Sequence, residues 1–264
     1  MRKYLTTAMA IALMSGTSFA DLQNIEVGAS LRTRANSTFD SGHNDTNAAS
    51  QFTEARTDIN IDADLSDEVS AHITLQNYGT WGDGGGTVGL YESYITLGDA
   101  VAGFDLNIGR QEVLLGSEFL VGNENTAGGF SGRSYDGIVA TTATDMFDLT
   151  LLSLKVSEND AGATLTDADT DLHGIYATYN GLEDHSIDGY VLYRRIGVPT
   201  ADNDELYTYG VRATGGYNSF DYEVEIALQD GDQSATVDYE GTAINAEVGY
   251  TFDSNMQPRV FLGV

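Results

Sequence analysis

Arginine side chains that alternate with apolar residues are the first feature of this 264-residue sequence that could do chemistry. A guanidinium group is always charged and binds carboxylates through two parallel hydrogen bonds. Asp and Glu residues share the polar faces, so each arginine could bind an anionic solute or pair with a neighbour such as Glu26, Glu54, Asp58 or Glu223. The two roles are compatible, because ion pairs on a wall also shape a passage. The arginines on polar faces are Arg32, Arg34, Arg56, Arg194 and Arg212.

Other chemistry has little support in the sequence. The four histidines are accompanied by no serine elbow and no His-x-x-x-His pair, so we expect no enzyme and no cofactor. Acidic clusters occur at 167–171 and 202–205. The first lacks the glycine and distal Glu of a calcium loop, which favours solvated loops over a metal site.

The arginines lie on segments with the two-residue period of β-strands. In the first, Ile25, Val27, Ala29 and Leu31 oppose Glu26, Ser30, Arg32 and Arg34. Most segments approach the roughly 9–11 residues that a tilted transmembrane strand needs, whereas soluble strands average about 5–6. The other candidate strands are 54–64, 69–76, 90–97, 104–112, 135–142, 146–156, 171–180, 186–195, 206–217, 220–229, 244–253 and 258–264.

The connections between these segments alternate in length, as they do in outer-membrane barrels with short periplasmic turns and long external loops. The pattern predicts an all-β, antiparallel up-and-down transmembrane β-barrel in the outer membrane. The long connections are 35–53, 80–89, 113–134, 157–170, 196–205 and 230–241, and the short ones are 65–68, 98–103, 143–145, 181–185, 218–219 and 253–257.

The two ends of the chain carry further expectations. Residues 1–20 read as a secretory signal peptide, with Arg2 and Lys3 before an apolar stretch and Ser18-Phe19-Ala20 at the cleavage position. Residues 21–264 then form the barrel. About thirteen strands are present, and bacterial barrels use even numbers. We therefore expect the sequence to lack its C-terminal strands, with about 16–18 in the complete protein.

The net charge of −28 excludes some partners. Nucleic acids and anionic membrane surfaces both select basic proteins. The expected partners are instead outer-membrane lipid, the barrel-assembly machinery and small hydrophilic solutes, anionic ones included.

The stretch Gly109-Arg110-Gln111, followed by Gly116 and by Gly132-Arg133-Ser134-Tyr135-Asp136-Gly137-Ile138, resembles the alginate-export family of outer-membrane barrels. The resemblance implies a monomeric barrel of about eighteen strands when complete, with a charged lumen that passes an anionic polysaccharide. The sequence departs from the family where Ile138-Val139-Ala140-Thr141 carries no further arginine, and its acidity would repel a polyuronate. Lumen-lining positions implied here are Arg32, Arg34, Arg56, Arg110, Arg133 and Asp136.

Arg110 conflicts with the period of its own strand. Phe104, Leu106 and Ile108 would place it towards lipid, where a charge costs roughly 2–4 kcal/mol at mid-membrane. Either a β-bulge near Gly109 returns Arg110 to the lumen, or the side chain lies beyond the apolar band.

The function expected from these features is a channel for hydrophilic solutes, with uronate-like anions as one class. The alternative is a non-conducting barrel with a structural or adhesive role, which presents acidic external loops. An inward fold of 113–134 that holds Glu118, Glu124 and Arg133 in the lumen would favour the channel, whereas a fully packed lumen would favour the alternative.

Overall fold

Thirteen β-strands make up the regular structure of the described part of the chain in a computed structural model. The structure describes residues 23–38, 50–83, 86–124, 130–158, 169–197 and 204–264, so the predicted signal peptide lies outside it. The strands are β1 (Gln23–Thr38), β2 (Ser50–Ser66), β3 (Val69–Thr80), β4 (Val88–Val101), β5 (Phe104–Gln111), β6 (Tyr135–Ala143), β7 (Phe147–Ser157), β8 (Thr170–Leu182), β9 (His185–Ile196), β10 (Asp204–Tyr217), β11 (Phe220–Ser234), β12 (Val237–Thr251) and β13 (Arg259–Gly263).

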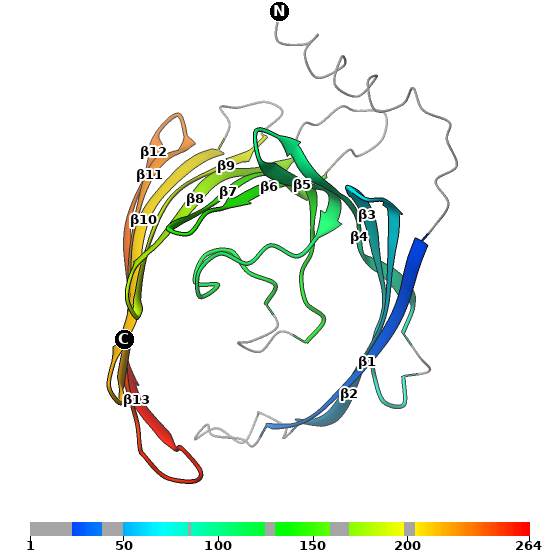
Figure 1. The fold of residues 1–264 in the computed structure, drawn as a ribbon, viewed down its shortest axis with the longest axis horizontal. Coiled ribbons are helices and arrows are strands. Elements are labelled where there is room, and N and C mark those ends of the chain that lie inside the picture. Colours follow the sequence, from blue (N-terminus) through cyan, green and yellow to red (C-terminus); the bar gives the residue numbers. More distant parts are fainter. Residues whose placement is uncertain (1–22, 39–49, 84–85, 125–129, 159–168, 198–203) are drawn as a thin grey trace, which may run out of the picture.

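Every strand pairs antiparallel with the next one in the sequence, in a single sheet ordered β1 to β13. The sheet curves into an incomplete ring, with β1 and β13 as its two edges (Figure 1). The predicted all-β, up-and-down fold is confirmed. The total of 16–18 strands in the complete protein stays a prediction.

None of the described residues forms a helix that is both long and apolar enough to cross a membrane.

The outer face of the sheet is apolar and exposed over its middle. Leu31, Ile175 and Val211 are 72%, 53% and 57% exposed, which is what a lipid-facing band requires. Aromatic pairs lie towards the strand ends of this face. Phe220 and Tyr250 have ring centroids 4.8 Å apart near the short turns, and Tyr193 and Tyr207 are 4.8 Å apart towards the longer connections. Such girdles are typical of the two membrane–water interfaces.

The prediction of a long connection at 230–241 is wrong. β11 and β12 run on through it as a hairpin, with Asp232 opposite Asp238 and only residues 235–236 between the strands. The polar composition of the segment indicated a loop. Cross-strand pairing nevertheless continues to Ser234 and Val237, with one register shift after Asp232, and it satisfies the backbone of this segment.

The connection between β5 and β6 turns into the ring instead of away from it (Figure 1). We call residues 112–134 the inward segment, of which 112–124 and 130–134 are described. These described residues form no regular secondary structure. Its position therefore depends on contacts with the inner face of the sheet.

Candidate functional site

The described parts of the inward segment form a first limb, 112–124, and a second limb, 130–134. The first limb packs on an apolar sector of the inner face of the sheet. Its side chains Val113, Leu115 and Val121 are 6%, 8% and 5% exposed and belong to one buried cluster with the wall. The burial of three aliphatic side chains contributes about 1.5–3 kcal/mol each, which is enough to hold a short irregular segment. The wall residues of the cluster come from β6 to β9 and are Tyr135, Val139, Leu152, Leu154, Tyr176, Tyr190 and Leu192.

Gly116 permits the close approach of this limb to the wall. Its φ of +57° lies in the left-handed region, and a Cβ there would lie 2.7 Å from Tyr176 Oη. Only glycine meets both conditions without strain. Next to it, the Ser117 hydroxyl lies 3.5 Å from Glu225 Oε2, which brings the turn of the limb against β11.

A buried ionic network lies beneath this turn. Arg212 donates to Asp188 at 2.7 Å and to Glu223 at 2.9 Å. The hydroxyls of Tyr176 and Tyr190 donate to Asp188 and Glu225, both at 2.6 Å. Asp188 and Glu225 are 2% and 4% exposed, so these hydrogen bonds replace water that the carboxylates have lost.

A second set of contacts fixes the base of the inward segment. Glu112 accepts from the hydroxyl of Tyr91, and its backbone N–H donates to Glu92 at 2.9 Å. Asn123 donates to the other oxygen of Glu112 at 2.8 Å, and Tyr135 donates to the Gly122 carbonyl at 3.0 Å. A register shift in β4, between the partners of Thr74 and Leu75, turns both Tyr91 and Glu92 inward.

The second limb reaches the opposite, charged sector of the wall. Phe130 is 3% exposed and lies among Arg32, Arg34 and Tyr78. The two guanidinium carbons are 5.2 Å and 4.7 Å from the centroid of its ring, within the range of cation–π attraction. The described residues of the inward segment therefore contact both sectors.

Ion pairs cover the charged sector, which consists of the inner faces of β1 to β4. Arg34 binds Glu54 at 2.8 Å, and Arg56 binds Asp58 at 2.8 Å. The carboxylate of Glu54 also accepts from Tyr78 at 2.5 Å. Arg32, Arg34 and Arg56 thus lie on the inner face, as their strands predict. Whether they contact a solute stays a prediction.

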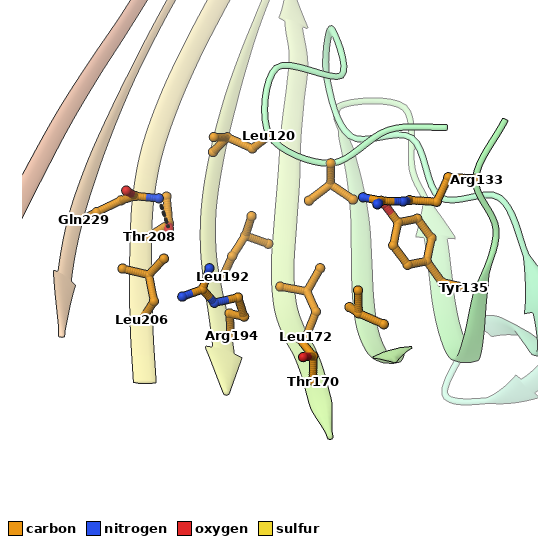
Figure 2. Close-up of a pocket in the computed structure, with 12 residues that line it drawn as sticks. Leu120, Arg133, Tyr135, Thr170, Leu172, Leu192, Arg194, Leu206, Thr208 and Gln229 are labelled. Carbon is orange, nitrogen blue, oxygen red and sulfur yellow. Dashed lines mark hydrogen bonds between the residues drawn. The ribbon is translucent and has the colours of Figure 1, made fainter. Parts of the chain in front are cut away.

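A pocket of about 310 Å³ lies beside the first limb, towards the long-connection ends of β8 to β10 (Figure 2). Arg133 and Arg194 both line it, and each also binds a carboxylate. Arg133 pairs with Glu124 at 2.8 Å, and Arg194 pairs with Asp204 at 2.9 Å. The predicted inward position of Glu124 and Arg133 therefore places a guanidinium beside an apolar surface.

Arg110 and Asp136 are the exception among the predicted lumen residues. They bind each other at 2.9 Å through Arg110 Nε, but on the outer face of the sheet. Their strands pair without a register shift at Gly109, and Tyr135 is buried while Asp136 is 53% exposed. The prediction that these two residues line the lumen is wrong, because the uninterrupted two-residue period directs them outward.

Carboxylates exceed guanidinium groups along the described inner face. Arg34, Arg56 and Arg194 each bind at least one carboxylate, and Arg212 binds two. Asp62, Glu92 and Glu225 add negative charge beyond these pairs. Among the described residues, no group of three His, Asp or Glu side chains is placed to hold a metal ion.

The sequence did not identify several residues of this site. The sequence did not reveal the apolar inner sector. Residues 149–154 place apolar side chains on both faces of the strand, so the two-residue alternation of apolar and polar residues is weak there. Phe130, Tyr91 and the network of Tyr176, Asp188 and Tyr190 act through contacts between distant strands. The glycines at 116 and 132 were the available signal that the connection bends sharply.

A family model and several solved structures are similar to this chain. A family model described as alginate export matches residues 23–264. Among solved structures, Pseudomonas putida OprB aligns with a TM-score of 0.53 at 12% identity, over 92% of this chain and 73% of that one. Salmonella typhi OmpF, in a complex with daunomycin, aligns with a TM-score of 0.45 at 11% identity, over 90% and 88%. No curated protein matches the chain.

Proposed function

The chain belongs to the alginate export family, and from this premise we propose that it passes hydrophilic solutes passively through a lumen narrowed by the inward segment. The protein is an outer-membrane channel of the porin type. The passive mechanism and the solute class are the parts that we propose. The barrel-assembly machinery and outer-membrane lipid remain predicted partners.

The observation that carries the proposal is the inward segment itself. Val113, Leu115 and Val121 anchor it on one sector and Phe130 on the other, so it crosses the lumen at a fixed place. A structural or adhesive barrel has no need of a segment in this position. A channel gains a constriction whose lining decides which solutes pass.

Uronate-like anions are a second candidate class of solute. The family description and the arginines Arg32 and Arg34 beside Phe130 favour them. The excess of carboxylates on the inner face opposes them, because like charges repel. We therefore rank neutral and cationic hydrophilic solutes ahead of polyuronates.

Recordings from a planar bilayer that contains the folded protein test the proposal. Discrete conductance steps are expected, and added uronate oligomers should block the current less than neutral oligosaccharides of the same length. Absence of steps from a protein shown to be folded would overturn the channel and leave the structural or adhesive role. Stronger block by the uronates would reverse our ranking of the solutes.

A further inference from the structure

The pocket in Figure 2 has the composition of a binding site for a small organic anion. Leu120 comes from the inward segment, and Thr208 and Gln229 come from the far side of the pocket. A volume of about 310 Å³ is at the lower end of the range for ligand sites. Aliphatic side chains form most of the surface, namely Leu120, Val121, Val156, Leu172, Leu192 and Leu206.

Arg194 supplies a charged group at this apolar surface. Its Nη2 donates to Asp204 at 2.9 Å and to the hydroxyl of Tyr239 at 3.1 Å. Its Nε atom is buried and has no hydrogen-bond partner. That atom is closed off from solvent, so a ligand would meet the accessible part of the Arg194 side chain, which is 34% exposed. Arg133 provides a second guanidinium across the pocket (Figure 2).

The remaining polar groups are too few for a sugar. Gln229 donates to Thr208 at 3.2 Å, and Tyr135 donates to the Gly122 carbonyl at 3.0 Å, so these groups already have partners. A sugar would lose the hydration of several hydroxyls against leucine and valine side chains, and that loss is costly.

We propose that this pocket binds a small monocarboxylate with an apolar body, such as an aromatic acid. Its carboxylate lies at Arg194, and its ring lies on a floor formed by Leu172, Leu192 and Leu206. The carboxylate excess of the lumen disfavours anions in general, so the apolar contact must supply much of the affinity. A single charge suffers least from this repulsion. The inference rests on the proposed channel only for the route by which the ligand reaches the pocket.

Calorimetric titration of the detergent-folded full chain with benzoate tests the inference. We expect a Kd of roughly 1 mM, typical of a ligand of this size. Benzyl alcohol lacks the charge and glucuronate lacks the apolar body, so both should bind at least about tenfold more weakly. Equal binding of either compound, or no heat with benzoate, would overturn the proposal.

Variants locate the bound anion. Arg194→Gln should weaken benzoate at least about tenfold, whereas Arg110→Gln, on the outer face of the sheet, should leave it unchanged. If Arg194→Gln does not fold, Leu206→Thr serves instead, because it makes the floor polar and should weaken benzoate while sparing the guanidinium. Unaltered binding in both pocket variants would contradict the site. Binding without conductance would overturn the channel alone, and conductance without binding would overturn the pocket alone.

Discussion

The inner face of the sheet has two unlike parts. They are the charged sector of β1 to β4 and the apolar sector of β6 to β10, which we call the covered sector from here on. In the first sector, charged side chains such as Arg34, Glu54 and Arg56 pair along and across neighbouring strands. In the second, leucine and tyrosine side chains face inward and the inward segment covers them. One sector can therefore stay wetted, whereas the other needs a cover to keep its apolar surface from water.

The difference shows why the inward segment lies where it does. Its first limb packs valine and leucine side chains on the covered sector. Its second limb packs Phe130 against guanidinium groups of the charged sector. The position of the inward segment thus follows from the unlike chemistry of the two sectors. Substitutions in the covered sector should change both the free energy of unfolding and the conductance of the lumen. Substitutions in the charged sector should change mainly the ion preference.

The largest loss of stability is expected from Arg212→Met in the covered sector. It leaves Asp188, 2% exposed, near Glu223 without a cation, which should cost about 3–5 kcal/mol of unfolding free energy. Arg34→Met in the charged sector should cost only about 1–2 kcal/mol, because Tyr78 and Asn36 still donate to Glu54. Denaturant unfolding of both variants measures the contrast, and equal losses would refute it.

A cavity variant should come next. Leu154 is 2% exposed in the buried cluster, and Leu154→Ala should cost about 2–5 kcal/mol. Its neighbour Leu151, on the outer face of the same strand, provides the matched control, and Leu151→Ala should cost about 1 kcal/mol. The same unfolding assay applies. A larger loss at Leu151 would mean that the inner cluster does not form.

The carboxylate excess predicts a measurable ion preference. Reversal potentials across a salt gradient should show that the channel prefers cations at about 0.1 M salt and less so at 1 M, where the Debye length falls to about 3 Å. An anion preference at low salt would mean that the arginines dominate the open passage. It would also remove the main objection to uronate solutes.

The smallest effect is expected on the outer face. Arg110→Ala removes a partner of Asp136 at a site where both side chains are about half exposed, so the cost should be about 0–1 kcal/mol. Conductance should be unchanged, because the pair lies away from the lumen. A large change in conductance would restore Arg110 to the inner face.

Much of the architecture could be predicted from the sequence, because the two-residue period is a local property. It assigned Arg32, Arg56 and Arg212 to the inner face, and it also placed Arg110 outward. The resemblance to the family placed Arg110 in the lumen, and there the period was the better guide. The lesson is that strand phase decides a side chain's direction more directly than a motif does.

The inward segment could be anticipated only in part. Its length and its glycines indicated an unusual connection, but no local pattern shows that Leu115 joins the same buried cluster as Tyr176 or that Phe130 meets Arg34. These contacts join residues far apart in the sequence. They exist only once the sheet has curved into a ring.

The most direct test of the constriction compares two neighbouring leucines in bilayer recordings. Leu115 is 8% exposed in the covered sector and Leu114 is 51% exposed, so Leu115→Asp should release the first limb and Leu114→Asp should not. We predict larger single-channel steps for Leu115→Asp and wild-type steps for Leu114→Asp. Identical steps in both folded variants would contradict the claim that the inward segment narrows the lumen.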